Sequence, residues 1–231
     1  MPPKPKRGNG AKSGGVESAL AALKRAGSKK VRDDMEPRYG IVAADAYGTP
    51  VGKIRLIAKS IGPDHELAAA LWKTGVYEAR MLAAFVAEPA RVTNAEMDGW
   101  CRDFDNWAIC DTMCFHLFDR TPHVFAKIDA WAAKKDEFVK RAAFALLASV
   151  ALHDKKAPDE PFLRALPLIE RAAEDERNFV KKGVSWALRG IGKRNAKLKA
   201  AAGELARRLS QSENAAARWV GKDALREFAK R

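Results

Sequence analysis

The sequence predicts an all-α protein, and three observations support this. Alanine, the best helix former, occurs 43 times, whereas Val, Ile and Thr, which favour strands, occur 13, 8 and 5 times. Apolar residues recur at steps of three and four from Val16 onwards, and no segment alternates apolar and polar residues as a strand would. Similar helical segments also return at a spacing of about 40 residues, which is typical of stacked helix pairs.

The first 15 residues differ in composition from the rest of the chain. They contain four basic residues, three prolines and four glycines, but no acidic residue. Such a segment cannot bury a hydrophobic core, so we expect a disordered basic tail over 1–15. The tail is either a solvated terminus or an arm that binds phosphates without sequence specificity. A single repeat domain is expected over 16–231.

Helices separated by short breaks are predicted for most of this domain. The first carries Val16, Leu20 and Leu23 on one face and ends near Gly27. The next is expected to have Thr49 as its N-cap and Pro50 at its first position, and to end at Gly62. Further helices are predicted over 64–74, 76–87, 94–103, 106–117, 123–134, 137–152, 159–174, 178–193, 196–210 and 215–229.

Several of these helices resemble one another. The segments VKRAAFALL (139–147), VKKGVSWAL (180–188) and ARWVGKDAL (217–225) follow at steps of 41 and 37 residues, and EARMLAAF (78–85) is a weaker copy. Helix pairs with this period are the signature of HEAT-like repeats. Because one pair cannot bury its apolar stripe alone, we expect antiparallel pairs to stack into a superhelical, ARM-like solenoid with a concave face.

The chain is strongly basic, with 42 Lys and Arg against 29 Asp and Glu and a net charge of +13. Residues 178–199 hold seven basic residues and no acid, and Lys182, Arg189 and Lys193 can share one helical face. Basic residues also recur near the start of the repeated helices, where stacking would align them: Arg80, Lys140, Arg141, Lys181, Lys182 and Arg218. This pattern predicts a stripe that binds the phosphates of duplex nucleic acid. The alternatives are a generic solvated face or a surface for an acidic protein.

Several other classes of protein fit the sequence poorly. Three cysteines do not form a disulfide framework, and we expect neither a membrane span nor a secretory signal. Cys101, Cys110, Cys114 and His116 lie within 16 residues, but without a CxxC motif buried thiols are favoured over a metal site. We expect no metal and no cofactor, and a monomer in the cytoplasm, associated with the nucleoid.

The segment FDNWAICDTMC at 104–114 contains the residues best suited to chemistry. Trp107 and Asp111 are four residues apart and therefore share a helical face, and a second tryptophan, Trp186, lies in the lysine-rich repeat. A carboxylate on a basic surface would repel phosphates, which makes its presence there informative. The alternative is that the tryptophans are packing residues and that Asp111 forms an ion pair with a nearby arginine.

Six segments together connect the chain to a known family: RYGI (38–41), YGTPVGKIRLIAK (47–59), LWKTGVYEAR (71–80), FDNWAICD (104–111), EFVKRAAFALL (137–147) and FVKKGVSWALRGIGKRN (179–195). In order and spacing they resemble the AlkD-type alkylpurine DNA glycosylases, which are HEAT-like repeat proteins, over residues 28–229. The resemblance implies that Trp107, Asp111 and Trp186 flank the lesion and that Arg141 lies with them at the centre of a concave groove.

The same resemblance implies monofunctional hydrolysis of the N-glycosidic bond of N3- or N7-alkylated purines in duplex DNA, without flipping of the base. An alkylated purine leaves as a neutral base while the sugar becomes cationic, so a carboxylate such as Asp111 near C1′ would stabilise the transition state. The faces of Trp107 and Trp186 would attract the cationic base. The alternative from another class is a non-catalytic HEAT-repeat protein that binds DNA structures or acts as a scaffold.

Overall fold

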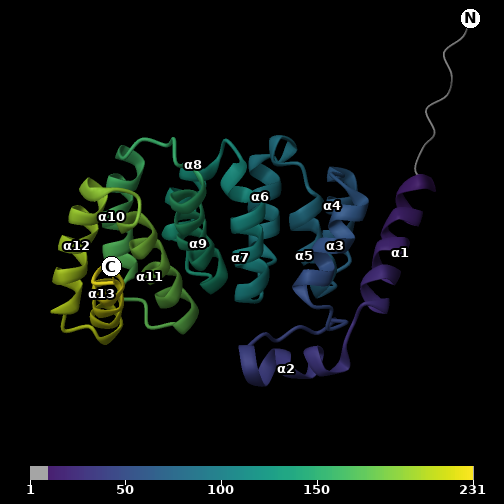
Figure 1. Ribbon diagram of the computed structural model, residues 1–231, viewed down its shortest axis with the longest axis horizontal. Coiled ribbons are helices and arrows are strands. Elements are labelled where there is room, and N and C mark those ends of the chain that lie inside the picture. The colour runs from purple at the N-terminus through teal and green to yellow at the C-terminus, as the bar shows by residue number, and fades with distance from the viewer. Residues whose placement is uncertain (1–9, 231) are drawn as a thin grey trace, which may run out of the picture. The chain divides into compact units, whose positions relative to one another are not determined.

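The computed structural model describes residues 10–230, and every regular element in this range is helical (Figure 1). The α-helices are α1 (Gly10–Arg25), α2 (Lys29–Tyr39), α3 (Val51–Ile61), α4 (His65–Lys73), α5 (Tyr77–Val86), α6 (Asn94–Arg102), α7 (Trp107–His116), α8 (Val124–Ala132), α9 (Glu137–His153), α10 (Glu160–Ala172), α11 (Asn178–Gly192), α12 (Ala196–Ser210) and α13 (Ala215–Phe228). Two 3-10 helices, η1 (Pro89–Arg91) and η2 (Phe118–Arg120), complete the described elements. The prediction of an all-α fold is confirmed.

The N-terminal part differs from the sequence prediction in two places. Helix α1 begins at Gly10, so residues 10–15, expected in the tail, are helical; adding residues to an existing helix costs far less than nucleating one. The rest of the expected tail, 1–9, lies outside the described residues. Helix α2 was not predicted, because its polar sequence lacks apolar periodicity. Ser28 caps its start, and Gly40, at φ 62°, ends it in the left-handed region that favours glycine.

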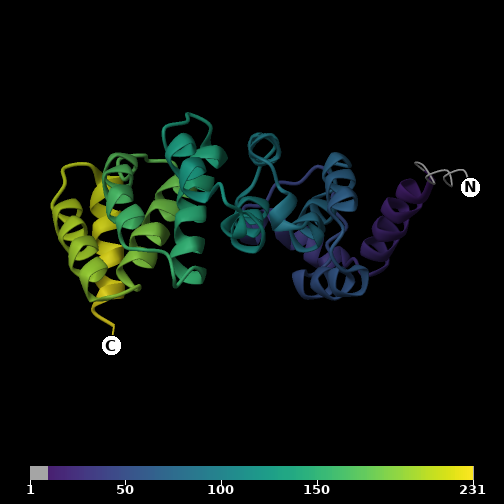
Figure 2. The ribbon, with the colours of Figure 1, turned by 90° about the horizontal axis from the view of Figure 1, so that it is seen from above.

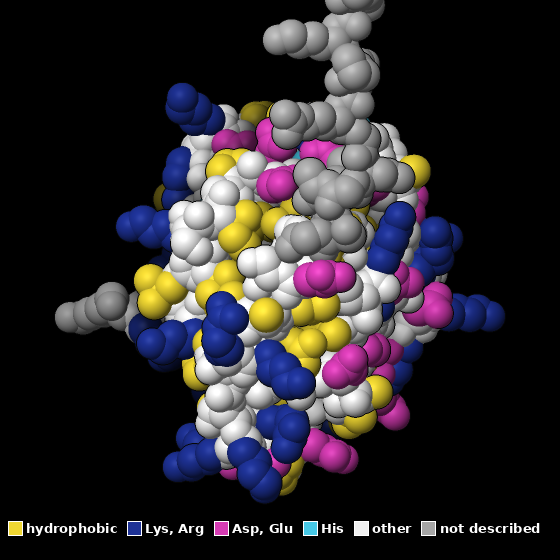
Figure 3. Space-filling model, turned by 90° about the vertical axis from the view of Figure 1, so that its right-hand side faces the viewer, with side chains coloured by type: hydrophobic (Ala, Val, Ile, Leu, Met, Phe, Trp, Pro, Cys, Tyr) yellow, Lys and Arg dark blue, Asp and Glu magenta, His cyan; other side chains and the backbone are white. Residues whose placement is uncertain are grey.

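The described chain forms two compact units that meet in sequence at Arg91 and Val92. In the first unit, α1 packs against α3, α4 and α5, and α4 packs against α5. Seen from the side of α1, Lys and Arg side chains gather over the lower half of the molecule, where α2 lies in Figure 1, with hydrophobic side chains exposed between them (Figure 3). On α1 and α2 the basic side chains described as exposed are Lys24, Arg25, Lys29, Lys30, Arg32 and Arg38. Positive charge is therefore not confined to residues 178–199.

A buried carboxylate organises the loop that precedes α3. The fully buried Glu78 of α5 accepts hydrogen bonds from the backbone N–H groups of Tyr47 (2.9 Å), Gly48 (2.7 Å) and Thr49 (3.1 Å). Gly48 has φ 72°, and a Cβ there would lie 2.2 Å from the Ser28 carbonyl oxygen, so only glycine fits. Two segments that carry the family resemblance, YGT (47–49) and YEAR (77–80), are thus joined by the hydrogen bonds to Glu78.

Thr49 is not the N-cap of α3, as the sequence suggested. Its hydroxyl is buried and donates to the Leu23 carbonyl oxygen over 2.8 Å, and Pro50 occupies the N-cap position. The Glu78 contact holds the Thr49 backbone, which turns this side chain towards α1 instead of towards the helix that follows. The predicted end of α3 at Gly62 is confirmed.

The second unit places the repeated helices next to one another. Helix α9 packs against α7 and α11, and α11 packs against α13, while α8 and α12 pair with α9 and α13 (Figures 1 and 2). Helix α9 is the centre of this core, since residues 141–151 are all buried. Gly221 allows the close packing of α13 on α12, because a Cβ there would lie 2.6 Å from the Ala206 carbonyl oxygen. From α4 onwards the predicted helix ranges agree with the observed ones to within two residues.

Between residues 10 and 230, no helix has both the length and the apolar character that spanning a bilayer would require.

Candidate nucleic-acid interface

Helix α7 begins where a buried asparagine caps it. The Asn106 side chain, 2% exposed, accepts a hydrogen bond from the Ile109 N–H over 3.0 Å and so fixes Trp107 as the first helical residue. From this start, Trp107, Asp111 and Phe115 follow at four-residue steps and share one face. All three are half-buried. We call these three residues the α7 row.

Asp111 forms a bidentate ion pair with Arg141. The Arg141 Nε donates to Asp111 Oδ1 over 2.8 Å, and its Nη2 donates to Oδ2 over 2.7 Å. The third nitrogen, Nη1, donates to the Phe179 carbonyl oxygen over 2.6 Å. One arginine of α9 therefore connects α7 with α11. The structure brings together two of the residues predicted from sequence. The ion pair between Asp111 and an arginine, considered above as an alternative, is present, and Arg141 is that arginine.

The two charges of this pair are buried to different degrees. The Asp111 side chain is 20% exposed and that of Arg141 is 7% exposed. Burial raises the pKa of the Asp111 carboxyl above its ordinary value, and the adjacent Arg141 guanidinium opposes this rise. Removing either partner would leave the other charge buried without compensation. Arg141 thus fixes the orientation of the Asp111 carboxylate and leaves part of it open to solvent.

Trp186 joins the α7 row through Phe115. Trp186 lies on α11 and is half-buried, and its ring stacks on that of Phe115 with centroids 6.3 Å apart and planes 24° apart. Sequence analysis missed Phe115, although its place four residues after Asp111 was a signal for it. The Phe179 carbonyl was missed because every residue has a backbone carbonyl, and the sequence does not indicate which one accepts a side-chain hydrogen bond.

Most of the recurring basic residues in the second unit make contacts within the protein. Lys140 pairs with Asp175 over 2.9 Å, and Lys181 lies above the Trp219 ring at 5.2 Å. Arg218 donates to the carbonyl oxygens of Ser212 and Glu213. These residues therefore connect or cap neighbouring segments, a role that the sequence analysis did not foresee. Their binding to phosphates stays a prediction.

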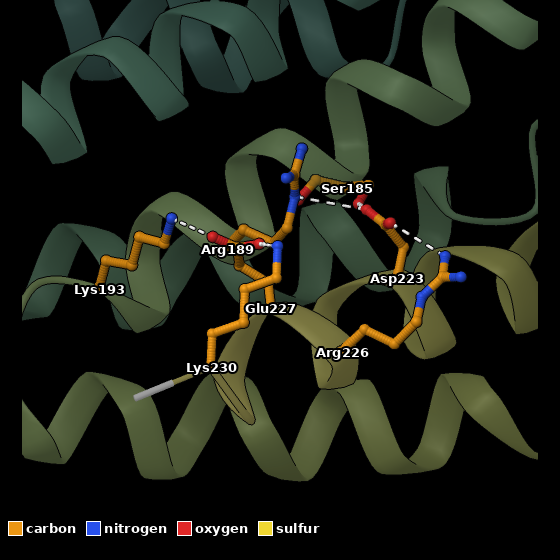
Figure 4. Close-up of polar contacts among 7 residues, drawn as sticks. All are labelled: Ser185, Arg189, Lys193, Asp223, Arg226, Glu227 and Lys230. Atoms are coloured by element: carbon orange, nitrogen blue, oxygen red, sulfur yellow. Dashed lines mark hydrogen bonds and ion pairs between the residues drawn. The ribbon is translucent and has the colours of Figure 1, made fainter.

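Acidic residues of α13 partly neutralise the basic face of α11, as Figure 4 shows for Arg189 and for Lys193, which directly follows the helix. Arg189 lies 3.4 Å from Asp223, which also accepts a hydrogen bond from Ser185. Lys193 pairs with Glu227, and this contact, together with Lys230, lowers the pKa of that carboxyl. The sequence signal was available: Asp223 and Glu227 are four residues apart on the helix that stacks next to α11. Counting charge within 178–199 alone overlooked them.

Lys182 is the exposed member of the predicted DNA-binding set on α11 that takes part in none of these pairs. Its ammonium group can bind a phosphate without first breaking either of these ion pairs. Substitution of Lys182 is therefore the most direct test of whether this helix binds phosphates.

The cysteines near the α7 row are buried thiols. Cys110 and Cys114 lie on the inner side of α7, and their sulfur atoms contact the carbonyl oxygens of Phe138 and Ala142 on α9. Burial raises the pKa of the Cys114 thiol well above its ordinary value. In the part of the chain that the structure describes, no three His, Cys, Asp or Glu side chains group as metal ligands would.

A comparison with protein families assigns the chain. The model of the family described as DNA alkylation repair enzyme matches residues 19–228. The chain belongs to this family. A search of curated proteins finds no match. The α7 row, Arg141 and Trp186 all lie within the matched range of the DNA alkylation repair enzyme family.

One solved structure shows the same fold at low sequence identity. It comes from "a new family of proteins related to the HEAT-like repeat DNA glycosylases with affinity for branched DNA structures"; it has a TM-score of 0.76 and 18% identity, and the match covers 91% of this chain and 94% of that one. Two designed armadillo repeat proteins follow. The one in complex with the peptide (KR)4 has a TM-score of 0.36, 15% identity and coverage of 95% and 82%. The other has a TM-score of 0.34, 16% identity and coverage of 94% and 92%. The match with a TM-score of 0.76 confirms the predicted fold class, all-α with HEAT-like helix pairs.

Proposed function

We propose that this protein is an AlkD-type, monofunctional DNA glycosylase that hydrolyses the N-glycosidic bond of N3- or N7-alkylated purines in duplex DNA. The observation that carries the proposal is the arrangement around Asp111. Its carboxylate is held by two hydrogen bonds from Arg141, on the same helical face as Trp107 and Phe115, and Trp186 of α11 stacks on Phe115. An oriented anion among aromatic faces matches a cationic lesion whose sugar gains positive charge.

The chemistry needs little besides this anion. The alkylated purine already carries the positive charge that makes it a good leaving group, so no acid has to protonate it. As the bond to C1′ breaks, the exposed part of the Asp111 carboxylate stabilises the cationic sugar and orients a water molecule towards it. Arg141 prevents the carboxylate from turning away, and the ring of Trp107 adds attraction for the cationic base. No residue is assigned to strand cleavage.

Release of base from methylated duplex DNA tests the proposal directly. We expect the protein to release N3-methyladenine or N7-methylguanine faster than spontaneous depurination and to leave an abasic strand that breaks only under alkali. A parallel incubation without protein supplies the uncatalysed rate, which must be subtracted. Release at the uncatalysed rate, with a folded protein that binds the duplex, would reject glycosylase activity.

We also propose that duplex DNA binds through phosphate contacts that include Lys182. Replacing Lys182 by glutamate should weaken duplex binding and reduce the slope of log K against log salt by about 0.9, because one phosphate contact is lost. Fluorescence anisotropy with undamaged duplex at a series of salt concentrations measures both quantities.

Arg164→Glu is the matched control for this variant. Arg164 is also exposed, but it lies on α10, the first helix of the pair that contains α11. The charge change is the same, so a general effect of net charge would appear in both variants. An equal loss of affinity in the two would show that Lys182 makes no specific phosphate contact.

A non-catalytic function is the second candidate. The solved structure with a TM-score of 0.76 belongs to proteins described as having affinity for branched DNA, although 18% identity supports a shared fold only. Competition between a four-way junction and a methylated duplex separates the candidates. Preference for the junction without base release would favour the structure-binding function. As part of the main proposal, we expect a cytoplasmic, nucleoid-associated monomer.

A further inference from the structure

Phe115 contacts two aromatic rings from other helices, and the proposed reaction does not use these contacts. One ring face stacks on Trp186, with the planes 24° apart. The His153 ring meets it edge-on, with centroids 4.2 Å apart and planes 70° apart. Phe115 is nevertheless only half-buried, and it lies one helical turn beyond Asp111 on the α7 row. A core phenylalanine in this fold, such as Phe118 or Phe144, is fully buried.

His153 is itself held by a buried carboxylate. It is the last residue of α9, and its Nδ1 bonds to Oδ2 of Asp119 on η2. The Asp119 side chain is fully buried, and its Oδ1 accepts no hydrogen bond from the described residues; the nearest cation is the Nε of Arg120, at 3.9 Å. Burying a carboxylate with so few partners costs free energy. The hydrogen bond between Asp119 and His153 offsets part of this cost, and it also holds the imidazole ring against Phe115.

We propose that Phe115 is a further residue of the lesion-binding surface, and that Asp119 and His153 are positioning residues that act on it. This inference rests on the proposed glycosylase function. A half-buried phenylalanine and tryptophan have several rotamers available, and a planar base that stacks on them would have to select one. Its contacts with the His153 and Trp186 rings already restrict the Phe115 side chain. The base then binds a preorganised aromatic surface and loses less conformational entropy.

The charge of the lesion explains why aromatic residues are used. An alkylated purine is a flat cation, which ring faces attract both by stacking and by their quadrupole. An undamaged purine is uncharged, so it gains binding free energy from stacking alone. The surface should therefore contribute to discrimination between alkylated and undamaged DNA, whereas the exposed lysines contribute equally to both.

The test compares affinities instead of rates. The probes are two duplexes of the same sequence, one with guanine and one with N7-methylguanine on a 2′-fluorinated sugar, where the electron-withdrawing fluorine prevents hydrolysis. We expect Phe115→Leu to weaken binding of the methylated duplex by about 10-fold and binding of the undamaged duplex by less, because the undamaged base loses stacking alone. Phe115→Tyr keeps the ring and should restore the ratio of the two affinities. Should Phe115→Leu fail to fold, Phe115→Met, of similar volume, takes its place.

Phe125→Leu is the matched control, since Phe125 is a half-buried phenylalanine that packs on Phe162 through α8 and α10. It should leave the affinity ratio unchanged. The positioning role predicts that His153→Leu and Asp119→Asn each lower the ratio by about threefold, and that His153→Gln, which still donates to Asp119, retains most of it. A thermal melt must show that each variant is folded, because a structural defect would lower both affinities together.

The outcomes separate the two proposals. If the unchanged protein shows no preference for the methylated duplex, the lesion-binding function itself fails, and this inference with it. If the protein prefers the methylated duplex and Phe115→Leu keeps the full ratio, only the role of Phe115 is overturned. If Phe115→Leu lowers the ratio but the His153 and Asp119 variants do not, Phe115 binds the lesion without being positioned by them.

Discussion

Asp111→Asn should lower the rate of base excision by ~10²–10³-fold, the usual scale for removing one preorganised electrostatic group. Asparagine keeps the size of the side chain and can still accept one hydrogen bond from Arg141, but it supplies no negative charge to the developing cationic sugar. Binding of undamaged duplex should persist or become tighter, because a repulsion against phosphates is removed and the Arg141 charge is unmasked. Single-turnover base release and anisotropy measure the two effects separately.

The ion pair with Arg141 makes a stability control essential. Breaking a buried pair by neutralising one partner costs about 3–5 kcal/mol in typical cases, so loss of activity alone would be ambiguous. Asp175→Asn is the matched control: Asp175 is also largely buried and pairs with Arg177 and Lys140, but it lies outside the α7 row. It should destabilise the protein and leave excision by the folded fraction unchanged. Full excision by Asp111→Asn with weakened DNA binding would show that Asp111 is structural.

Glu78→Gln should destabilise the first unit by about 3 kcal/mol. The glutamate accepts three backbone N–H groups in a fully buried site, and hydrogen bonds to a charged acceptor are worth more than those to a neutral one. Glutamine removes the charge and points its own N–H₂ group at one of the three donors. Hydrogen exchange at the Tyr47, Gly48 and Thr49 amides should then be roughly 100-fold faster, and the thermal melt of this unit should move to lower temperature.

Glu66→Gln provides the comparison in the same unit. Glu66 is exposed and pairs with Arg91, a surface contact whose loss should change stability by no more than about 0.5 kcal/mol. DNA contacts in the second unit should be unaffected by either substitution. Equal, small effects of the two variants would mean that the loop over 45–49 is held by other contacts, and that Glu78 does not organise it.

Local sequence signals were sufficient for most helices. Breaks at Gly62 and Gly75, and caps such as Thr93 and Asn195, act within a few residues, so they are visible without the fold. Among the described α-helices, α2 was missed because it lacks apolar periodicity and begins at a serine cap that alone is a weak signal. The early start of α1 was missed because its first turns carry glycines that composition assigns to a tail.

For the candidate site, the sequence identified Trp107, Asp111, Arg141 and Trp186, the first two by their spacing and all four by family resemblance. It did not show that Arg141 is the partner of Asp111, because these residues are 30 positions apart and lie on different helices. Nor did it show that α13 supplies acids to Arg189 and Lys193. A charge count along one helix cannot detect neutralisation by the next helix in the stack.

Helix propensity, apolar period and helix breaks are properties of neighbouring residues, so the repeating helix pairs could be predicted from the sequence alone. The tertiary structure decided which polar side chains remain available for a ligand. Stacking sets the rotation of each helix against the next, and a small change in that rotation exchanges one ion-pair partner for another. For this reason the orientation of Asp111, the aromatic contact between Phe115 and Trp186 and the exposure of Lys182 could be found only in the folded chain.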